Sequence, residues 1–144
     1  MDAEDPFDLD RFVAAQADSW AQALAELNAG LKRSHWMWYI FPQIAGLGRS
    51  DTARRYAIRS MDEARAYLAH PLLGPRLADA TAALLRHPAR TAEQMLGAVD
   101  AIKLRSSLTL FVAAGAGSPL DIALWTFFAD ERDAETMRLL GRAG

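Results

Sequence analysis

The apolar residues of this chain recur at three- and four-residue intervals, which is the spacing of one face of an α-helix. The first such stretch covers residues 8–28 and is followed by Gly30, a typical helix stop. The most apolar stretch covers residues 99–114, and the glycine-containing residues 115–119 end it. No stretch shows the alternating β-branched pattern of a strand. The spacing therefore predicts an all-α fold.

Helix-start signals divide the rest of the sequence into shorter helices. The signals are Ser50, Ser60 with Glu63, Pro71, and Thr91 with Gln94. They predict a helix over residues 50–58, helices that begin at residues 60 and 71, and a short turn that ends at Gly97. Residues 120–128 and 133–140 add two more helices. We expect one compact, irregular bundle of about seven helices, a single domain over residues 1–144.

The composition excludes several classes of protein. The chain has 144 residues, no cysteine and a formal net charge of −2. The charge balance argues against a nucleic-acid binder, and the lack of cysteine excludes disulfides and a cysteine nucleophile. The three histidines are not spaced as metal ligands, so we predict no metal and no cofactor.

The sequence also carries no signal for a membrane. Residues 1–10 are acidic and lack the basic and apolar regions of a signal peptide. No apolar run reaches the roughly 18 residues of a membrane span. We therefore predict a cytoplasmic protein that does not bind membranes.

An aromatic stretch is the most specific motif in the chain. It reads HWMWYIFPQ over residues 35–43 and is followed by Gly46-Leu47-Gly48 and Ser50. Further motifs are DPFDL at residues 5–9, RFV at 11–13 with Gln16, HP at 70–71, LGPRL at 73–77, and Asp100 with KLRSSLTLF at 103–111. Together they closely resemble the small bacterial and fungal proteins catalogued as domain of unknown function 1810, some of which carry the label calpastatin.

The resemblance covers nearly the whole chain and implies an all-helical fold of this length. It implies no activity and no catalytic residue. The calpastatin label adds nothing, because calpastatin inhibits as a disordered chain and this sequence has the composition of a folded domain. Any chemistry must be inferred from the residues themselves.

The first candidate site surrounds the aromatic stretch. Its members are Lys32, Arg33, His35, Trp36, Trp38 and Gln43. Cations bind phosphate or carboxylate, an indole face stacks on a flat group, and an amide binds a polar edge, so the set suits a planar anionic ligand. The alternative is that the tryptophans belong to the core and the cations are solvated. His35 is the candidate for proton transfer.

The second candidate group is Asp100, Lys103 and Ser107, which share one strip of an apolar helix. Charges on such a face cost desolvation, so they either form a structural ion pair or the polar floor of a pocket. Gln16 interrupts another apolar stripe and needs a partner when buried. It either ties down an irregular segment, such as residues 44–49, or faces the same pocket as Lys103.

Two weaker signals concern phosphate and nucleic acid. The loop at residues 46–50 contains two glycines and runs into a helix N-terminus, where free N–H groups can hold a phosphate. It matches no phosphate-binding fingerprint, and a plain turn with a cap fits better. We interpret Arg54 and Arg55 as part of a solvated face.

Two functions stay open at this point. The first is a domain that binds a small anionic or nucleotide-like ligand through Lys32, Arg33, His35 and Lys103. If it is also an enzyme, His35 transfers a proton and Lys103 stabilises negative charge.

The alternative is a protein-interaction module without catalysis. The aromatic stretch or residues 125–128 would then form an apolar patch for a partner or for self-association. Trp36 and Trp38 distinguish the two functions: in a concave pocket they favour the ligand, and on a convex surface they favour the partner protein.

Overall fold

The computed structural model describes residues 5–143, with side chains through residue 141, so part of the acidic N-terminal stretch lies outside the described residues. Within this range the chain forms ten helices and no strand, which confirms the predicted all-α class. They are α1 Asp10–Ala17, α2 Trp20–Ala29, α3 Met37–Ile40, α4 Asp51–Arg55, α5 Met61–Ala69, α6 Leu73–Leu85, α7 Ala92–Leu96, α8 Ala98–Ala113, α9 Leu120–Phe128 and α10 Ala134–Ala143. Seven of them have eight or more residues, in agreement with the predicted bundle. No helix in the described range is long and apolar enough to cross a membrane.

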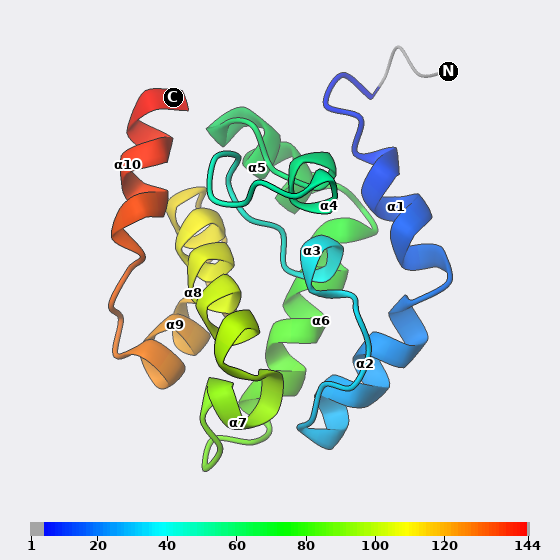
Figure 1. Ribbon diagram of the computed structural model, residues 1–144, viewed down its shortest axis with the longest axis vertical. Helices are drawn as coiled ribbons and strands as arrows, with labels where there is room; N and C mark the ends of the chain where they lie inside the picture. The colour runs from blue at the N-terminus through cyan, green and yellow to red at the C-terminus, as the bar shows by residue number, and fades with distance from the viewer. Residues whose placement is uncertain (1–4, 144) are drawn as a thin grey trace.

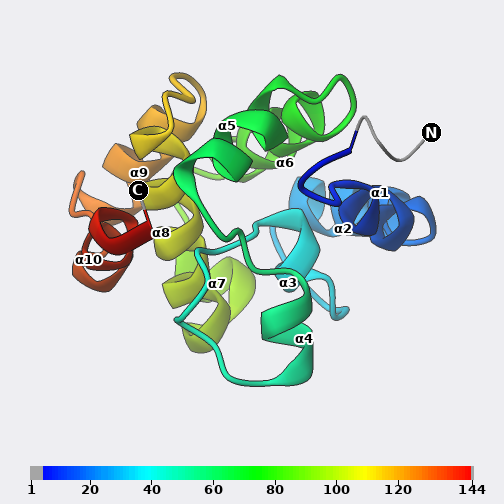
Figure 2. The same ribbon diagram turned by 90° about the horizontal axis from the view of Figure 1, so that it is seen from above.

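Two central helices, α6 and α8, connect the other elements. In Figure 1, α8 runs beside α9 and α10 on one side of the molecule, and α1 and α2 lie on the opposite side. Figure 2 shows α5 and α6 on one face and the short helices α3 and α4 on the other. Helix α8 packs against α5, α7, α9 and α10, whereas α6 packs against α2, α5 and α9.

The core is a single apolar cluster to which nearly all of the helices contribute. Its largest fully buried side chains include Trp36, Tyr67, Phe12, Phe41 and Phe111. The ring of Tyr67 packs against two of the other rings, with centroid distances of 5.1 Å to Phe12 and 5.1 Å to Phe111. Trp36 is 1% exposed, so its indole belongs to this core.

The helix predicted over residues 8–28 is in fact two helices, α1 and α2, and the prediction of one continuous element was wrong. The break falls at Asp18 and Ser19. The Ser19 hydroxyl donates to the carbonyl of Ala15 at 2.9 Å, and its N–H bonds the carbonyl of Gln16 only three residues back. Serine side chains compete in this way for backbone carbonyls, so they favour helix ends.

Capping signals located most other helix starts. Ser50 caps α4 as predicted, because its side chain accepts a backbone N–H at 3.1 Å. The predicted capping box of Thr91 and Gln94 is confirmed at α7. The helix expected over residues 50–58 nevertheless ends at Arg55, since Ile58 pairs with Ile44 instead of continuing the helix.

A short backbone pairing replaces the end of that helix. Ile58 forms an isolated parallel bridge with Ile44. The N–H of Ile58 donates to the carbonyl of Gln43, and the N–H of Ala45 donates to the carbonyl of Ile58, both at 2.8 Å. The pairing joins the segment after α3 to the segment after α4 and so closes one side of a pocket.

Candidate functional site

A pocket of about 260 Å³ opens between α3, the loop at residues 44–49 and the connection from α4 to α5. Trp38 and Tyr56 supply aromatic surface, Arg54 and Arg59 supply positive charge, and Gln43 supplies an amide. Smaller residues complete the lining: Ile44, Ala45, Gly46, Gly48, Ala53 and Ala57. Among the described residues that line this pocket, none is acidic. It therefore combines flat apolar surface with positive charge.

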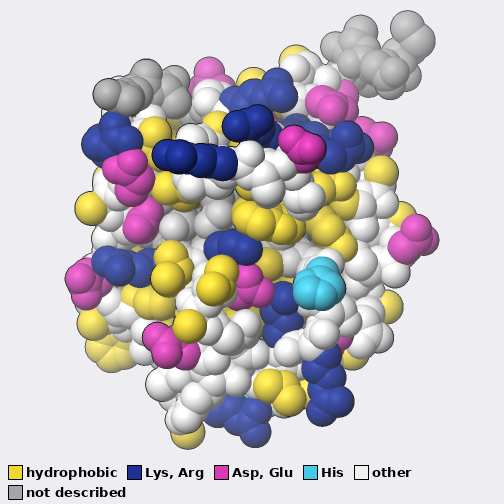
Figure 3. All heavy atoms as spheres, in the orientation of Figure 1, with side chains coloured by type: hydrophobic (Ala, Val, Ile, Leu, Met, Phe, Trp, Pro, Cys, Tyr) yellow, Lys and Arg dark blue, Asp and Glu magenta, His cyan; other side chains and the backbone are white. Residues whose placement is uncertain are grey.

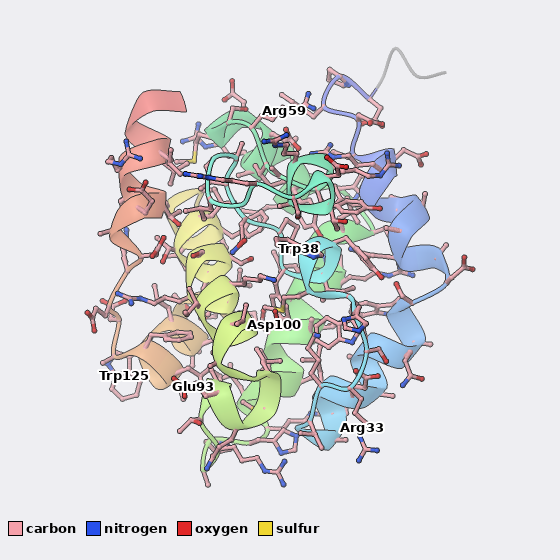
Figure 4. All side chains as sticks on the ribbon, viewed as in Figure 1. Arg33, Trp38, Arg59, Glu93, Asp100 and Trp125 are labelled. Atoms are coloured by element: carbon pink, nitrogen blue, oxygen red, sulfur yellow. The ribbon has the colours of Figure 1, made fainter. Side chains whose placement is uncertain are left out.

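The two arginines keep their charge available to a ligand. Within the described residues, neither guanidinium, that of Arg54 nor that of Arg59, forms a salt bridge or a side-chain hydrogen bond, and both side chains are exposed. Lys and Arg side chains gather on this part of the surface, over α4 and the start of α5 (Figure 3). Figure 4 shows Arg59 above Trp38 on the same face. In a chain with a net charge of −2, this is a local concentration of positive charge.

Lys103 of α8 supports the indole of Trp38 from outside the pocket. Its Nζ atom lies 3.7 Å from the ring centroid of Trp38 and 3.3 Å from Oδ1 of Asp100. Oδ2 of Asp100 pairs with Nζ of Lys32 at 2.9 Å, and that ammonium lies 5.1 Å from the ring centroid of Trp36. The three charged side chains are only 10–20% exposed. The cluster fixes α3 against α8 and places a cation against the pocket wall.

A buried ion pair positions the chain between α4 and α5. The guanidinium of Arg11 donates to the carbonyls of Arg55 and Ala57 at 2.8 Å each. It also pairs with Glu63 at 2.6 Å, where the two side chains are 7% and 2% exposed. The other carboxylate oxygen of Glu63 accepts the N–H of Arg59 at 3.2 Å. The pocket residues on this connection are therefore held by α1 and α5.

The same ion pair changes a predicted cap. The hydroxyl of Ser60 accepts the N–H of Glu63 at 3.0 Å, as a capping box requires. The Glu63 carboxylate does not return the bond to Ser60, because Arg11 and the N–H of Arg59 occupy it. The predicted capping box therefore has only one of its two bonds, and the prediction of the bond from the Ser60 N–H to the Glu63 side chain was wrong.

Two glycines let the loop at residues 44–49 pass close to its neighbours. A Cβ atom on Gly48 would lie 2.5 Å from the Cβ of Ala53 and 3.7 Å from the ring of Trp38. Gly46 has a φ of +107°, and its Cβ position lies 3.1 Å from the side chain of Leu139 in α10. The loop is thus a close-packed turn that leads to the Ser50 cap.

The beginning of the aromatic stretch is organised by Glu26. Its carboxylate accepts hydrogen bonds from the N–H groups of Arg33 (2.7 Å) and Ser34 (2.9 Å), the Ser34 hydroxyl (2.5 Å), Nε1 of Trp36 (2.9 Å) and Gln22 (2.7 Å). Burial raises the pKa of Glu26, but these bonds, that from Ser34 first, outweigh burial and hold the pKa well below its ordinary value of 4.5. We call this set of five residues the Glu26 network.

Only some of the predicted site residues meet at the pocket. Trp38 and Gln43 line it, and Lys103 contacts Trp38. Arg33 and His35 are exposed and lie outside its lining. Figure 4 shows Arg33 far from Arg59, at the end of the molecule near α2.

Gln16 acts as a structural tie. Its Nε2 donates to the carbonyl of Tyr39 at 2.8 Å and to the hydroxyl of Tyr67 at 3.3 Å, and its Oε1 accepts from Arg76 at 3.3 Å. Burial raises the pKa of the Tyr67 phenol, although the bond from Gln16 opposes this, so the phenol stays neutral. The tie joins α1 to α3, α5 and α6 rather than to the loop at residues 44–49.

Ser107 forms no hydrogen bond with Asp100 or Lys103, the charged residues on the same strip of α8. It is fully buried, and its hydroxyl has no hydrogen-bond partner in the described part of the chain. The ammonium of Lys103 is directed to Asp100, three residues toward the other end of α8. The structure therefore does not join Ser107 to the pocket or to Lys103.

Sequence reasoning missed the cations that line the pocket. Arg54 was interpreted as part of a solvated face, and Arg59 and Tyr56 were not singled out. The available signal was the density of arginines and a tyrosine within residues 54–59, next to the glycine-containing loop. No group of three or more His, Asp or Glu side chains within the described residues is placed to hold a metal ion.

Fold and pocket together define a small all-helical protein with a basic, aromatic-lined pocket. The chain belongs to the family described as protein of unknown function (DUF1810), whose model matches residues 6–140 and confirms the resemblance seen in the motifs. It is similar to the conserved hypothetical protein Rv1873 from Mycobacterium tuberculosis, with 46% identity and a TM-score of 0.92 over 94% of this chain and 98% of that one. No curated protein matches the chain.

Proposed function

We propose that this protein binds a small, planar, anionic ligand of nucleotide-like chemistry in the pocket between α3 and α4. One observation carries the proposal: two aromatic rings and two arginines, which have no side-chain partner within the described residues, line the same hollow. Guanidinium groups bind phosphate and carboxylate through parallel N–H bonds. Aromatic rings offer a face to flat groups. The amide of Gln43 adds a polar contact for the edge of a ring.

The size of the pocket supports a small ligand. Its volume of about 260 Å³ is close to the lower limit of cavities that hold small molecules, which is roughly 300 Å³. That space suits one ring system with its charged group. The positive lining favours anions over neutral and cationic molecules of the same shape.

The proposal assigns binding rather than catalysis. His35, which the sequence suggested for proton transfer, does not line the pocket. Lys103 acts on the pocket through Trp38, because its ammonium lies against that ring. Lys103 is therefore a positioning residue in this proposal, and Arg54 and Arg59 are the ligand-binding cations.

A thermal-shift and calorimetry panel tests the proposal. The panel contains nucleoside monophosphates, aromatic carboxylates, sugar phosphates and inorganic phosphate. Planar anions should raise the melting temperature with increasing concentration, since they bind the native state. Arg54→Ala and Arg59→Ala should each weaken that binding about tenfold, which corresponds to one charged hydrogen bond of about 1.4 kcal/mol.

Arg33→Ala is the matched control, because Arg33 is an exposed arginine on the same face that does not line the pocket. Its affinity should equal that of the wild type. The proposal fails if no planar anion shifts the melting temperature, or if Arg33→Ala weakens binding as much as Arg59→Ala does.

A different observation favours a second candidate function, that of a protein-interaction module. Trp125 is 69% exposed on α9 (Figure 4), and Val99 and Ile102 are each 67% exposed on α8. Ile102 also lines a groove of about 470 Å³ together with Phe127 and Phe128. Exposed apolar patches of this kind are typical of surfaces that bind other proteins.

Sedimentation analysis over a range of concentrations tests self-association through this patch. The paired substitution Trp125→Ser with Ile102→Ser should convert any oligomer to monomer and leave ligand binding at the α3–α4 pocket unchanged. A wild-type protein that is monomeric at all concentrations would contradict self-association. An oligomer that persists in the double variant would place the contact elsewhere.

A further inference from the structure

A second hollow of about 360 Å³ adjoins the proposed ligand pocket. It is lined by Asp8, Arg11, Asp51, Arg54, Arg55 and Arg59. Two of these residues, Arg54 and Arg59, also line the first pocket. The two hollows therefore adjoin each other at Arg54 and Arg59.

The two hollows differ in their chemistry. The first contains the rings of Trp38 and Tyr56 and no acidic residue among those described, whereas the second contains charged residues and no ring. A flat apolar group fits the first, and a charged extension fits the second. The order of the two hollows thus matches a molecule with a ring at one end and a chain of charges at the other.

Arg55 is the cation that the second hollow adds. Arg11 also lines it, but its guanidinium is consumed by backbone carbonyls and by the ion pair with Glu63. The side chain of Arg55 is exposed, with its guanidinium carbon 5.6 Å from the ring centroid of Tyr56 and Nε 3.4 Å from that hydroxyl. Arg55 therefore lies against a ring of the first pocket while its charge faces the second hollow.

Two carboxylates oppose this positive charge. Asp8 and Asp51 line the second hollow, and no salt bridge joins either of them to an arginine within the described residues. They repel an anion that enters the hollow, whereas the first pocket has no such group. The affinity of the second hollow for an anion therefore depends on the attraction of Arg55 and the repulsion of Asp51 and Asp8.

We infer that the ligand carries a planar ring joined through a sugar to a diphosphate, as in the nucleoside diphosphate class. The inference rests on the proposed function. The ring occupies the aromatic pocket, the phosphate attached to the sugar lies beside Arg54 and Arg59, and the terminal phosphate reaches Arg55 in the second hollow. Several guanidinium groups beside adjoining hollows suit successive phosphates, because each phosphate accepts paired N–H bonds.

Calorimetry at fixed ionic strength tests the inference with adenosine, adenosine monophosphate and adenosine diphosphate. The uridine series repeats the measurement with a smaller ring, and inorganic pyrophosphate and a short oligothymidylate complete the probes. The diphosphate should bind about tenfold more tightly than the monophosphate, which is the effect of one further charged contact. The nucleoside should bind most weakly, and pyrophosphate more weakly than the diphosphate ester.

Two variants assign the gain to the second hollow. Arg55→Ala should remove the tenfold advantage of the diphosphate and leave the monophosphate affinity within about twofold of wild type. Asp51→Asn should act in the opposite direction and tighten the diphosphate more than the monophosphate, because it removes a repelling charge. Arg86→Ala, at an exposed arginine outside both hollows, is the control and should change neither affinity.

The outcomes separate this inference from the proposed function. If no planar anion binds, both fail. If the monophosphate binds as tightly as the diphosphate, or Arg55→Ala weakens both equally, the proposed function stands and the diphosphate class is wrong. Pyrophosphate that binds as tightly as the diphosphate ester would also overturn the inference, since the ring would then contribute nothing. Tighter binding of oligothymidylate would replace it with a polynucleotide ligand.

Discussion

The chain from α2 to α5 contains two regions that use polar side chains in opposite ways. In the Glu26 network, a carboxylate that is 4% exposed accepts hydrogen bonds from backbone and side chains around it. In the pocket that follows, Arg54 and Arg59 have no side-chain partner within the described residues and face an open hollow. Both regions read as polar and aromatic in the sequence.

The difference separates polar groups that stabilise the fold from charged groups that are available to a ligand. A group whose hydrogen bonds are all made within the protein stabilises the fold and has nothing left for a ligand. A charged group that borders a hollow and lacks a partner contributes little to the fold, and its charge is available. The two regions should therefore respond to mutation in opposite ways, in stability for the first and in affinity for the second.

The largest effect is expected for Glu26→Ala. The change leaves the indole N–H of Trp36 and the N–H groups of the Glu26 network without their acceptor, so the free energy of unfolding should fall by about 3 kcal/mol. Urea denaturation measures it, with the exposed Glu93→Ala as control, expected within about 0.5 kcal/mol of wild type. A small loss of unfolding free energy in Glu26→Ala would mean that the Glu26 network does not stabilise the fold more than the pocket arginines do.

The pH dependence of stability sharpens the same point. The folded-state pKa of Glu26 is lower than its ordinary value of 4.5. The network therefore contributes its stability above pH 4.5 and loses it as the pH falls further. Unfolding free energies of the wild type and Glu26→Gln should differ most near pH 7 and converge toward acid pH. A difference that stays constant from pH 7 to pH 3 would exclude ionised Glu26 as the cause.

Gly48→Ala should have an intermediate effect, and it should lower both stability and ligand affinity. A Cβ atom there would lie 2.5 Å from the Cβ of Ala53, so the loop must move away from α4. Overpacking of this kind costs about 1–3 kcal/mol, and ligand affinity should fall as well because the pocket changes shape. Gly141→Ala, where a Cβ atom meets nothing within 4 Å, is the control and should keep both stability and affinity.

Lys103→Met should have a smaller effect on stability, about 1 kcal/mol, because it removes one cation–π contact and one ion pair of Asp100. Asp100 keeps Lys32 as a partner. Ligand affinity and the fluorescence of Trp38 should change, since the cation against that ring is gone. Lys103→Arg keeps the positive charge, so it should preserve the wild-type ligand affinity and fluorescence. If Lys103 only fills space, Lys103→Met should preserve them as well.

The smallest change in stability is expected for Arg54→Ala. Because this exposed side chain has no side-chain partner within the described residues, its loss should alter the unfolding free energy by less than about 0.5 kcal/mol. Denaturation and calorimetry on the same sample compare stability with affinity. A loss of stability as large as that of Glu26→Ala would show that Arg54 belongs to the structural framework.

The local parts of the fold could be predicted from the sequence. Helix α9 covers Leu120–Phe128, the stretch that its apolar spacing indicated, and α7 begins at the predicted box. Such signals depend on residues within one or two turns of each other. The pair of Arg11 and Glu63 joins residues 52 positions apart, so no local pattern indicates it.

The candidate site was predictable only in part for the same reason. Trp38 and Gln43 were singled out because tryptophan and glutamine beside cations are chemically distinctive. The sequence indicates a solvated face at Arg54 and gives no signal at Arg59, since an exposed arginine has the same sequence whether it faces open water or a hollow. The pairing at Ile44 and Ile58 joins the two segments that line the pocket, and no local pattern indicates that Arg54, Arg59 and Trp38 share it.

That pairing also makes hydrogen exchange a measure of pocket opening. The amide protons of Ala45 and Ile58 form the bonds that join the two segments, so each can exchange with deuterium when the segments separate. Separation of two short segments needs no unfolding of α6 or α8. A ligand that bridges them should slow the exchange of both amides together, and amides within α8 should keep their own slower rates. The exchange rates of these two amides therefore report whether a ligand occupies the pocket.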